Sequence, residues 1–314
     1  MSFSNDVRNE LARLMPGKSC CCKSELAALV NSNGSLEDTE KDSILLKVTA
    51  ENAATARKIF LLLKESYKLP SRVQVEKSKR FKKSRRYEVN TYFKQNEKWI
   101  IDELIFSSKD FKAASRIKSG SIKNNCCKRA FLRGVFLSRG FINRPEGEYH
   151  LEIAFSSEYL LKLVQNLLLN YDVQARSIER KHHLGLYIKE SEKIADFLRI
   201  AGANQALLEF ENVRIIKSMR NSVNRQVNCE TANLAKTVDA SIRQVDLIEK
   251  LIKENRLQSL SPQLKELAML RINFPDNSLK ELGLMLDPPL SKSGVAYRMR
   301  KLEALAETVL SNTK

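Results

Sequence analysis

The sequence lacks any long run of apolar residues. Its longest such runs lie near residues 59–63, far short of the roughly 20 residues that cross a bilayer. The first residues also lack the basic segment followed by an apolar segment that marks a secretory signal. We therefore expect no membrane partner and a cytoplasmic location. The chain has 314 residues, 43% of them hydrophobic, which is enough for two domains with cores of their own.

Cysteine and histidine are scarce. Five of the six cysteines lie in two runs, Cys20–Cys22 and Cys126–Cys127, and adjacent cysteines do not readily pair with each other. This arrangement argues against the spaced framework of a secreted disulfide-rich domain. None of the three histidines lies beside the cysteines in the sequence, whereas a structural zinc site needs four ligands at a suitable spacing. We favour small buried thiols at helix starts over a structural metal, and we expect no metal and no cofactor.

Acidic residues are too few to balance the basic ones. Lysine and arginine number 54 against 37 aspartates and glutamates, a formal net charge of +17. Such an excess favours a polyanionic partner, with nucleic acid as the leading candidate. The densest basic segment, residues 72–94, has interleaved aromatic residues and is predicted to form a phosphate-contacting hairpin, with a solvated arm as the alternative. The candidate phosphate contacts in this hairpin are Lys79, Arg80, Lys82, Lys83, Arg85 and Arg86.

Two segments 106 residues apart repeat one another. Residues 20–34 and 126–140 both begin with Cys-Cys, continue as an apolar helical run and end at a glycine. The similarity continues in each copy through a strand pattern, a second helix ending in tyrosine, and further strands. We predict an α+β domain over residues 1–210, with repeats at about 1–100 and 105–210, a pseudo-two-fold axis and a joint sheet.

The repeated helices resemble the LAGLIDADG motif of homing endonucleases. Residues 25–36 and 131–142 align with that motif without a gap. The resemblance implies small residues where the two helices cross closely, and Ala27, Ala28 and Gly134 stand at such positions. It therefore implies a duplicated, homing-endonuclease-like fold for this part of the chain.

The catalytic positions of this motif depart from the family pattern. The resemblance implies a metal-binding acid just before the closing glycine, but Asn33 and Arg139 occupy these positions. The other acidic position of the motif falls on Asn31 and Leu137. Two-metal cleavage of a phosphodiester needs anionic oxygen ligands for Mg²⁺, and an arginine repels the metal. We expect a degenerate domain that has lost its metal site and is not an enzyme.

The chain changes character after residue 210. Residues 212–228 carry four basic residues and no acid. We assign 211–228 as a basic linker, either a plain tether or a tether that also contacts DNA phosphates. Its candidate phosphate contacts are Arg214, Lys217, Arg220 and Arg225. Residues 229–314 are assigned as an all-α DNA-binding domain.

This last domain contains the pattern of a helix-turn-helix. Ser261 and Pro262 start one helix, and Asn277 or Ser278 caps the next over 279–286. Tandem prolines at 288 and 289 require a turn before the final helix, which runs from 292 to about 310. A helical hairpin for protein contact is the alternative interpretation.

The final helix has two chemically distinct faces. At 100° per residue, Val295, Met299 and Leu302 form an inward stripe, and the opposite face is basic and polar. A recognition helix places such residues near base edges in the major groove. The predicted DNA contacts are Ser291, Lys292, Ser293, Ala296, Tyr297, Arg298, Arg300 and Lys301.

Three segments resemble the WhiA sporulation-regulator family: residues 224–237, 278–283 and 288–295. That family joins a degenerate LAGLIDADG domain to a helix-turn-helix resembling region 4 of sigma factors. The resemblance implies a nucleoid-associated, sequence-specific transcriptional regulator linked to sporulation or cell division. Double-stranded DNA is the implied partner, with another transcription factor or RNA polymerase as a further one. The alternatives are an active LAGLIDADG-type endonuclease and a protein-interaction scaffold acting in cell division.

Overall fold

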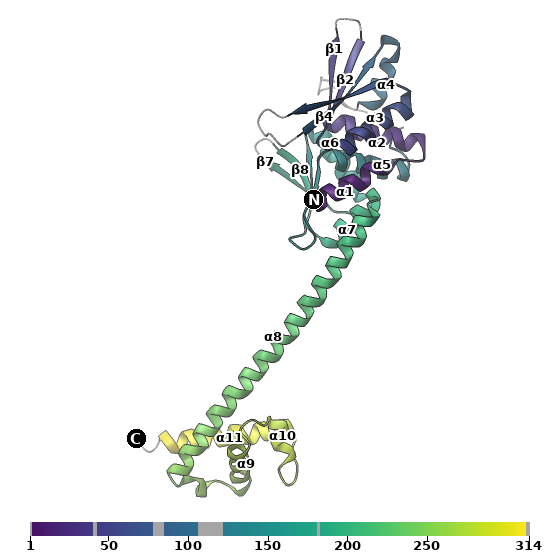
Figure 1. The fold of residues 1–314 in the computed structure, drawn as a ribbon. Helices are drawn as coiled ribbons and strands as arrows, with labels where there is room; N and C mark the ends of the chain where they lie inside the picture. The colour runs from purple at the N-terminus through teal and green to yellow at the C-terminus, as the bar shows by residue number, and fades with distance from the viewer. Residues whose placement is uncertain (1, 40–42, 78–84, 106–121, 181–182, 312–314) are drawn as a thin grey trace. The chain divides into compact units, whose positions relative to one another are not determined.

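A computed structural model describes residues 2–39, 43–77, 85–105, 122–180 and 183–311. Its contacts divide the chain into two compact units, Met1–Ser218 and Met219–Lys314. Each unit is described by itself, and the course of the chain through both can be followed by colour in Figure 1.

The first unit contains the predicted duplication. Helix α1 (Phe3–Arg13) precedes it, and each copy then runs helix, two strands, helix, two strands, helix. The first copy consists of α2 (Ser19–Asn33), β1 (Gly34–Thr39), β2 (Ser43–Ala50), α3 (Ala53–Tyr67), β3 (Ser71–Lys77), β4 (Arg85–Phe93), a 3₁₀ turn η1 (Gln95–Glu97) and α4 (Lys98–Leu104). The second consists of α5 (Asn125–Arg139), β5 (Gly140–Ile142), β6 (Leu151–Phe155), α6 (Glu158–Leu169), β7 (Arg176–Arg180), β8 (His183–Ile188) and α7 (Ser191–Ala201). The duplicated α+β architecture is confirmed.

Each copy builds its own antiparallel sheet. The strand orders are β1-β2-β4-β3 and β5-β6-β8-β7. In both sheets the glycine that ends the motif helix starts the first strand, with Gly34 opposite Val48 and Gly140 opposite Ile153. The predicted joint sheet is wrong, because no strand of one copy pairs with a strand of the other among the described residues. Instead, every described strand pairs with strands of its own copy.

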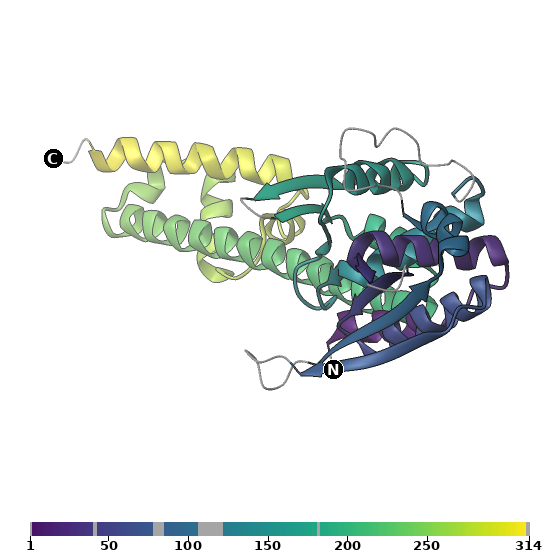
Figure 2. The same ribbon diagram turned by 90° about the horizontal axis from the view of Figure 1, so that it is seen from above.

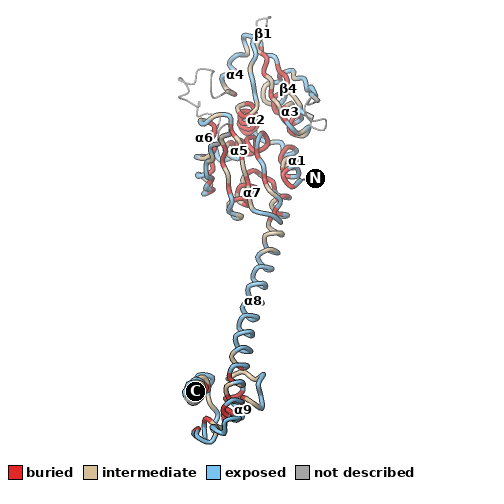
Figure 3. The backbone as a smooth tube through the Cα atoms, turned by 90° about the vertical axis from the view of Figure 1, so that its left-hand side faces the viewer, coloured by how far each residue is buried: buried red, intermediate tan, exposed pale blue. Residues whose placement is uncertain are grey.

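Helices α2 and α5 pack directly against each other in the core of the first unit. A Cβ atom at Gly134 would lie 2.6 Å from the carbonyl oxygen of Glu25 and 2.8 Å from the Cβ of Ala28. A side chain at residue 134 would therefore force the helices apart. Ala27 and Ala28 are also buried, and both helices are largely buried along their length (Figure 3). The close helix crossing that the LAGLIDADG resemblance implies is present.

Helix α8 (Asn204–Lys253) runs through the boundary between the two units. The segment predicted as a linker, residues 211–228, lies inside this single helix. Residues 219–239 are exposed on every side (Figure 3). Beyond them, apolar side chains of the helix are buried at Ile248 and Leu251. The tether is therefore helical.

The described residues of the second unit form helices joined by turns, with no strand among them, as the green to yellow part of Figure 2 shows. After the end of α8 it consists of the 3₁₀ turn η2 (Arg256–Ser259), α9 (Pro262–Asn273), α10 (Leu279–Leu284) and α11 (Lys292–Ser311). Its core joins all four α-helices through side chains such as Ile248, Leu267, Leu282, Val295 and Met299.

The turn chemistry of this unit follows the predicted signals. Ser261 is the N-cap of α9, with Pro262 in the first turn. At α10 the Glu281 N–H donates to the Ser278 hydroxyl at 3.3 Å, and the Ser278 N–H donates to the Glu281 carboxylate at 2.7 Å. This reciprocal cap fixes the start of the helix. Gly283 lies against the backbone of Leu290. A residue without a side chain is therefore needed where the turn between α10 and α11 passes close to α10.

Candidate nucleic-acid interface

Helix α11 presents a basic polar face to solvent. Val295, Met299 and Leu302 are at most 1% exposed and form the inward stripe that the spacing predicts. Tyr297, on the opposite face, is 65% exposed. Of the predicted contacts, Ser291, Lys292, Ser293, Tyr297, Arg300 and Lys301 are exposed, whereas Ala296 and Arg298 are half-buried. Packing against the core therefore determines which side chains of α11 remain exposed and could contact a DNA groove.

The start of α11 is held by its own side chains. Gly294 donates its N–H to the Ser291 hydroxyl at 3.2 Å, and the hydroxyls of Ser291 and Ser293 lie 2.9 Å apart. Farther along, the Nε of Arg300 donates to the carbonyl of Ala296 at 3.3 Å, and the guanidinium stays exposed. These contacts orient the N-terminal turns, which are the part of a recognition helix that approaches base edges.

The candidate phosphate contacts of the linker fall into two groups. Lys217 donates to the carbonyls of Pro145 and Gly147, at 3.3 and 2.8 Å, and lies over the ring of Tyr149. The Nε of Arg214 lies 2.8 Å from the carboxylate of Glu211. These two side chains serve contacts within the first unit. Arg220 and Arg225 are exposed and stay candidates for phosphate contact.

Only part of the predicted basic hairpin belongs to the described chain. Lys79, Arg80, Lys82 and Lys83 lie outside the described residues. Arg85 and Arg86 start β4, and Arg86 is exposed. On the neighbouring strand β3, Glu76 lies opposite Arg86.

Asn33 and Arg139 meet where the nuclease resemblance implies a metal site. The Nε of Arg139 donates to Oδ1 of Asn33 at 2.7 Å, and Nδ2 of Asn33 donates to the carbonyl of Ser138 at 3.3 Å. The neutral oxygen that remains at this position is therefore already bonded to a cation. A divalent metal would have to displace an arginine from a weak ligand.

A cavity of about 380 Å³ opens beside this pair. Arg8, Arg86 and Arg139 line it, and Glu51 is the one carboxylate among its described lining residues. Glu51 lies 3.8 Å from the guanidinium of Arg8. Three cations around one carboxylate suit a phosphate and do not suit Mg²⁺.

The sheets of the first unit carry acids as well as bases. Lys47 lies 2.6 Å from Glu37 across β2 and β1, and His150 lies 3.0 Å from Glu152. Acids placed beside basic groups lower the local positive potential. These ion pairs therefore neutralise part of the basic charge of the described sheets.

A buried ion cluster, which the sequence analysis did not predict, lies between α2, α3 and α5. The Glu25 side chain is fully buried, and its two oxygens face Lys58 and Arg133. Arg133 donates from Nε at 3.0 Å and from Nη2 at 2.7 Å, and also reaches the carbonyl of Ala201. Burial lowers the pKa of Lys58 below its usual range, although Glu25 opposes this shift. The cluster joins the two repeats.

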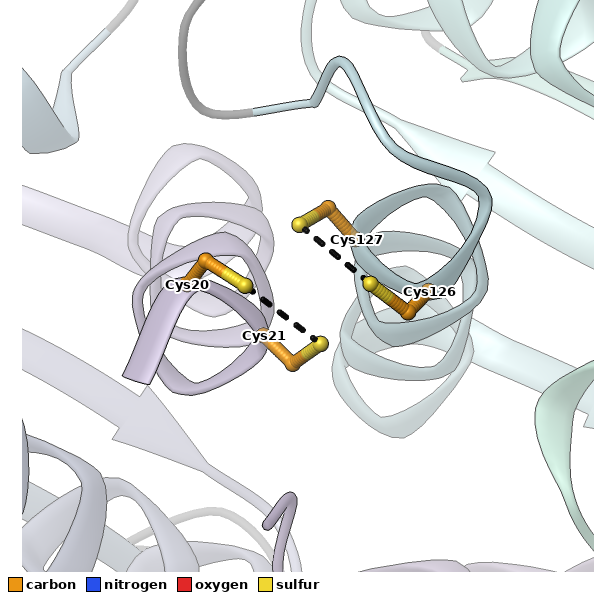
Figure 4. A group of neighbouring side chains, drawn as sticks. All are labelled: Cys20, Cys21, Cys126 and Cys127. Atoms are coloured by element: carbon orange, nitrogen blue, oxygen red, sulfur yellow. Dashed lines mark hydrogen bonds between the residues drawn. The ribbon is translucent and has the colours of Figure 1, made fainter. Parts of the chain in front are cut away.

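Four cysteines, two from each repeat, also converge (Figure 4). The sulfur atoms of Cys20, Cys21, Cys126 and Cys127 all lie within 4.8 Å of one another. The expectation of buried thiols holds for Cys21, Cys22 and Cys127, but Cys20 is exposed. The sequence contained a signal for this convergence, because Cys20 precedes Gly34 by the same number of residues as Cys126 precedes Gly140. Two equivalent helices that pack side by side in a symmetric pair also place their first residues side by side.

The fold joins a duplicated LAGLIDADG-like domain to a helix-turn-helix domain, and both kinds of domain support a DNA partner. Three family models match it in order: the WhiA N-terminal LAGLIDADG-like domain at residues 19–104, the WhiA LAGLIDADG-like domain at 128–220, and the WhiA C-terminal HTH domain at 223–306. The chain belongs to the WhiA family.

Full-length relatives support this assignment. The chain is 54% identical over 312 residues to the "Probable cell division protein WhiA" of Syntrophomonas wolfei, covering 99% of both chains. It is 44% identical to the protein of the same name from Heliobacterium modesticaldum, covering 98% of this chain and 96% of that one. The crystal structure of full-length DUF199/WhiA from Thermatoga maritima matches with a TM-score of 0.59 at 26% identity, covering 98% of this chain and 99% of that one.

None of the helices in the described part of the chain has the length and apolar character needed to cross a membrane.

Proposed function

We propose that the protein is a sequence-specific DNA-binding transcriptional regulator that reads bases with α11. One observation carries the proposal: Tyr297, Arg300 and Lys301 are exposed on the side of α11 opposite its buried stripe. A helix held in this way can enter a major groove with its polar face outward. Footprinting of the full chain on genomic DNA tests the proposal. Discrete protected sites that survive competitor DNA support it, and uniform protection contradicts it.

We further propose that the LAGLIDADG-like domain does not cleave DNA. Arg139 occupies one former acid position and is hydrogen-bonded to Asn33, which occupies the other. Catalysis by two metals requires carboxylates that hold both ions near the scissile phosphate. The cationic cavity beside this pair supports phosphate binding without cleavage.

Supercoiled plasmid incubated with the full chain and either Mg²⁺ or Mn²⁺ is expected to remain supercoiled, because no carboxylate holds a metal at the former acid positions. Gel electrophoresis over time gives the result. An Asn33→Ala variant purified in parallel is the control for contaminating nucleases. Nicking by the wild-type chain that disappears in this variant would contradict the proposal.

Replacing Lys79, Arg80, Lys82 and Lys83 together by alanine is expected to weaken binding to all DNA sequences alike. Each phosphate contact contributes about −0.9 to the slope of log K against log salt, so losing several contacts flattens that slope. Titrations at several salt concentrations on a protected site and on a scrambled site provide the measurement. The ratio between the two sites should persist. Unchanged affinity and slope would show that the segment does not contact phosphates.

The regulated genes are proposed to belong to sporulation or cell division. The relatives carry the printed name "Probable cell division protein WhiA", which supports the second of these. A regulator at a promoter also meets RNA polymerase or another transcription factor, and we propose one of these as a protein partner. Transcription in vitro from the protected fragments, with and without the protein, tests this role. Equal transcript levels at all of them would contradict it.

A further inference from the structure

The starts of the two motif helices form one group of thiols. Cys20 and Cys21 lie in the first turn of α2, and Cys126 and Cys127 lie in the first turn of α5. The sulfurs within each pair are 4.0 Å apart, and all four lie within 4.8 Å of one another (Figure 4). Two sequence neighbours from each repeat therefore point toward a common centre.

We propose that these four cysteines bind one Zn²⁺ ion as a tetrahedral thiolate site between the two repeats. Zinc–sulfur bonds of about 2.3 Å place the sulfurs of a tetrahedral site about 3.8 Å apart. The observed group is slightly wider, so small side-chain rotations bring it to that geometry. The group contains sulfur ligands alone, without a carboxylate or an imidazole among the described residues. Soft thiolates select zinc over Mg²⁺ or Ca²⁺.

The surroundings suit a structural ion with an entry path. Cys21 and Cys127 are buried, Cys126 is half-buried and Cys20 is exposed. Ala130 packs against the buried thiols. One side of the group is therefore closed by apolar contact, while the exposed ligand lets an ion enter from solvent. No water-filled channel through the core is required.

Burial raises the pKa of the Cys21 and Cys127 thiols, so Zn²⁺ itself must displace their protons, as a metal does when it deprotonates a coordinating thiol. The helix starts offset part of the charge that results. All four cysteines lie in the first turns of 15-residue helices, where unpaired N–H groups and the helix dipole stabilise negative charge. Neither first turn contains an acidic residue. Four thiolates around Zn²⁺ leave a net charge of about −2, which these two helix starts can offset.

The site would fix how the two repeats meet. The Ser24 hydroxyl donates to the carbonyl of Cys127 at 2.8 Å, so the helix starts are already tied together by a buried hydrogen bond. A bound ion adds four bonds at the same end of the helix pair. It would therefore stabilise the duplicated domain whether or not the chain regulates transcription.

Cobalt(II) is the probe for this site, because tetrahedral cobalt thiolates absorb strongly in the visible range. The full-length protein, reduced and stripped of metal, is titrated with Co²⁺ and then with Zn²⁺. We expect one Co²⁺ per chain, an intense absorption, and its loss when Zn²⁺ displaces the cobalt. Zn²⁺ should also raise the thermal unfolding midpoint of the wild-type chain.

The test variant is Cys20→Ser with Cys126→Ser, which leaves the buried thiols Cys21 and Cys127 in place. We expect the cobalt absorption and the zinc-dependent rise in midpoint to disappear. Cys229→Ser, which removes an exposed thiol of the second unit, is the matched control and should change neither. If circular dichroism shows that the double variant is unfolded, Cys20→Ser alone gives the same test at an exposed position.

Three results would overturn the zinc site. The reduced wild-type chain could bind no Co²⁺ at micromolar concentrations. The absorption could persist in the serine variants, which would place the ion elsewhere. Mass spectrometry of protein isolated without reductant, with free thiols alkylated at lysis, could instead find a disulfide between the two helices.

Discussion

Replacing Glu25 by alanine is expected to destabilise the first unit by about 3–5 kcal/mol, because it leaves Lys58 and Arg133 as uncompensated buried charges. The side chains of Glu25 and Lys58 are fully buried, so solvent does not screen the loss. Trp99, the single tryptophan of the sequence, lies on α4 and packs edge-on against Tyr67. Its fluorescence during urea unfolding therefore reports the first unit separately from the helix-turn-helix.

A matched glutamate provides the control for this change. Glu158 pairs with Lys162 on the surface of α6, with more than half of each side chain exposed. Glu158→Ala should shift the urea midpoint very little, because exposed ion pairs contribute little to stability. Equal midpoint shifts for the two variants would show that the Glu25 cluster does not stabilise the fold.

Replacing Arg300 by alanine is expected to weaken binding to a cognate site by roughly 5- to 150-fold if its guanidinium reads a base. Binding to unrelated DNA should change far less, since one phosphate contact is a small part of non-specific affinity. Titration of a labelled protected site and a scrambled site gives both constants. Equal weakening on both DNAs would make Arg300 a phosphate contact.

Arg243 supplies the matched arginine. It is exposed on α8, and its Nε donates to the carbonyl of Asp239 at 3.4 Å, the same i to i−4 contact that Arg300 makes to Ala296. Arg243→Ala removes the same charge and the same backbone contact from another helix. Its ratio of specific to non-specific affinity should equal that of the wild-type chain.

The internal repeat and the local capping residues made much of the fold predictable from the sequence. The glycines at 34 and 140 end the motif helices and begin the first strands of both sheets. Serine caps and the proline turn likewise located α9, α10 and α11, and the spacing of Val295 and Met299 gave the buried face of α11. These features depend on neighbours within a few turns or on an obvious duplication.

Features that depend on distant partners escaped prediction. Glu25 and Arg133 interrupt apolar runs, which indicates an unusual environment, but their contact joins residues 108 positions apart. The meeting of the four thiols requires knowing that α2 and α5 start side by side. By contrast, the helical course of 211–228 follows from local signals, since Arg214, Lys217 and Arg220 are spaced three apart and the segment contains no proline or glycine.

Selection of binding sites from a random DNA pool tests the central claim most directly. The full-length wild-type chain and a Tyr297→Ala, Arg300→Ala variant are carried through the same rounds. The wild-type chain is predicted to enrich one discrete consensus, and the variant is predicted to lose base preference at the positions that α11 reads. An identical consensus from both proteins, or none from the wild-type chain, would contradict sequence recognition by α11.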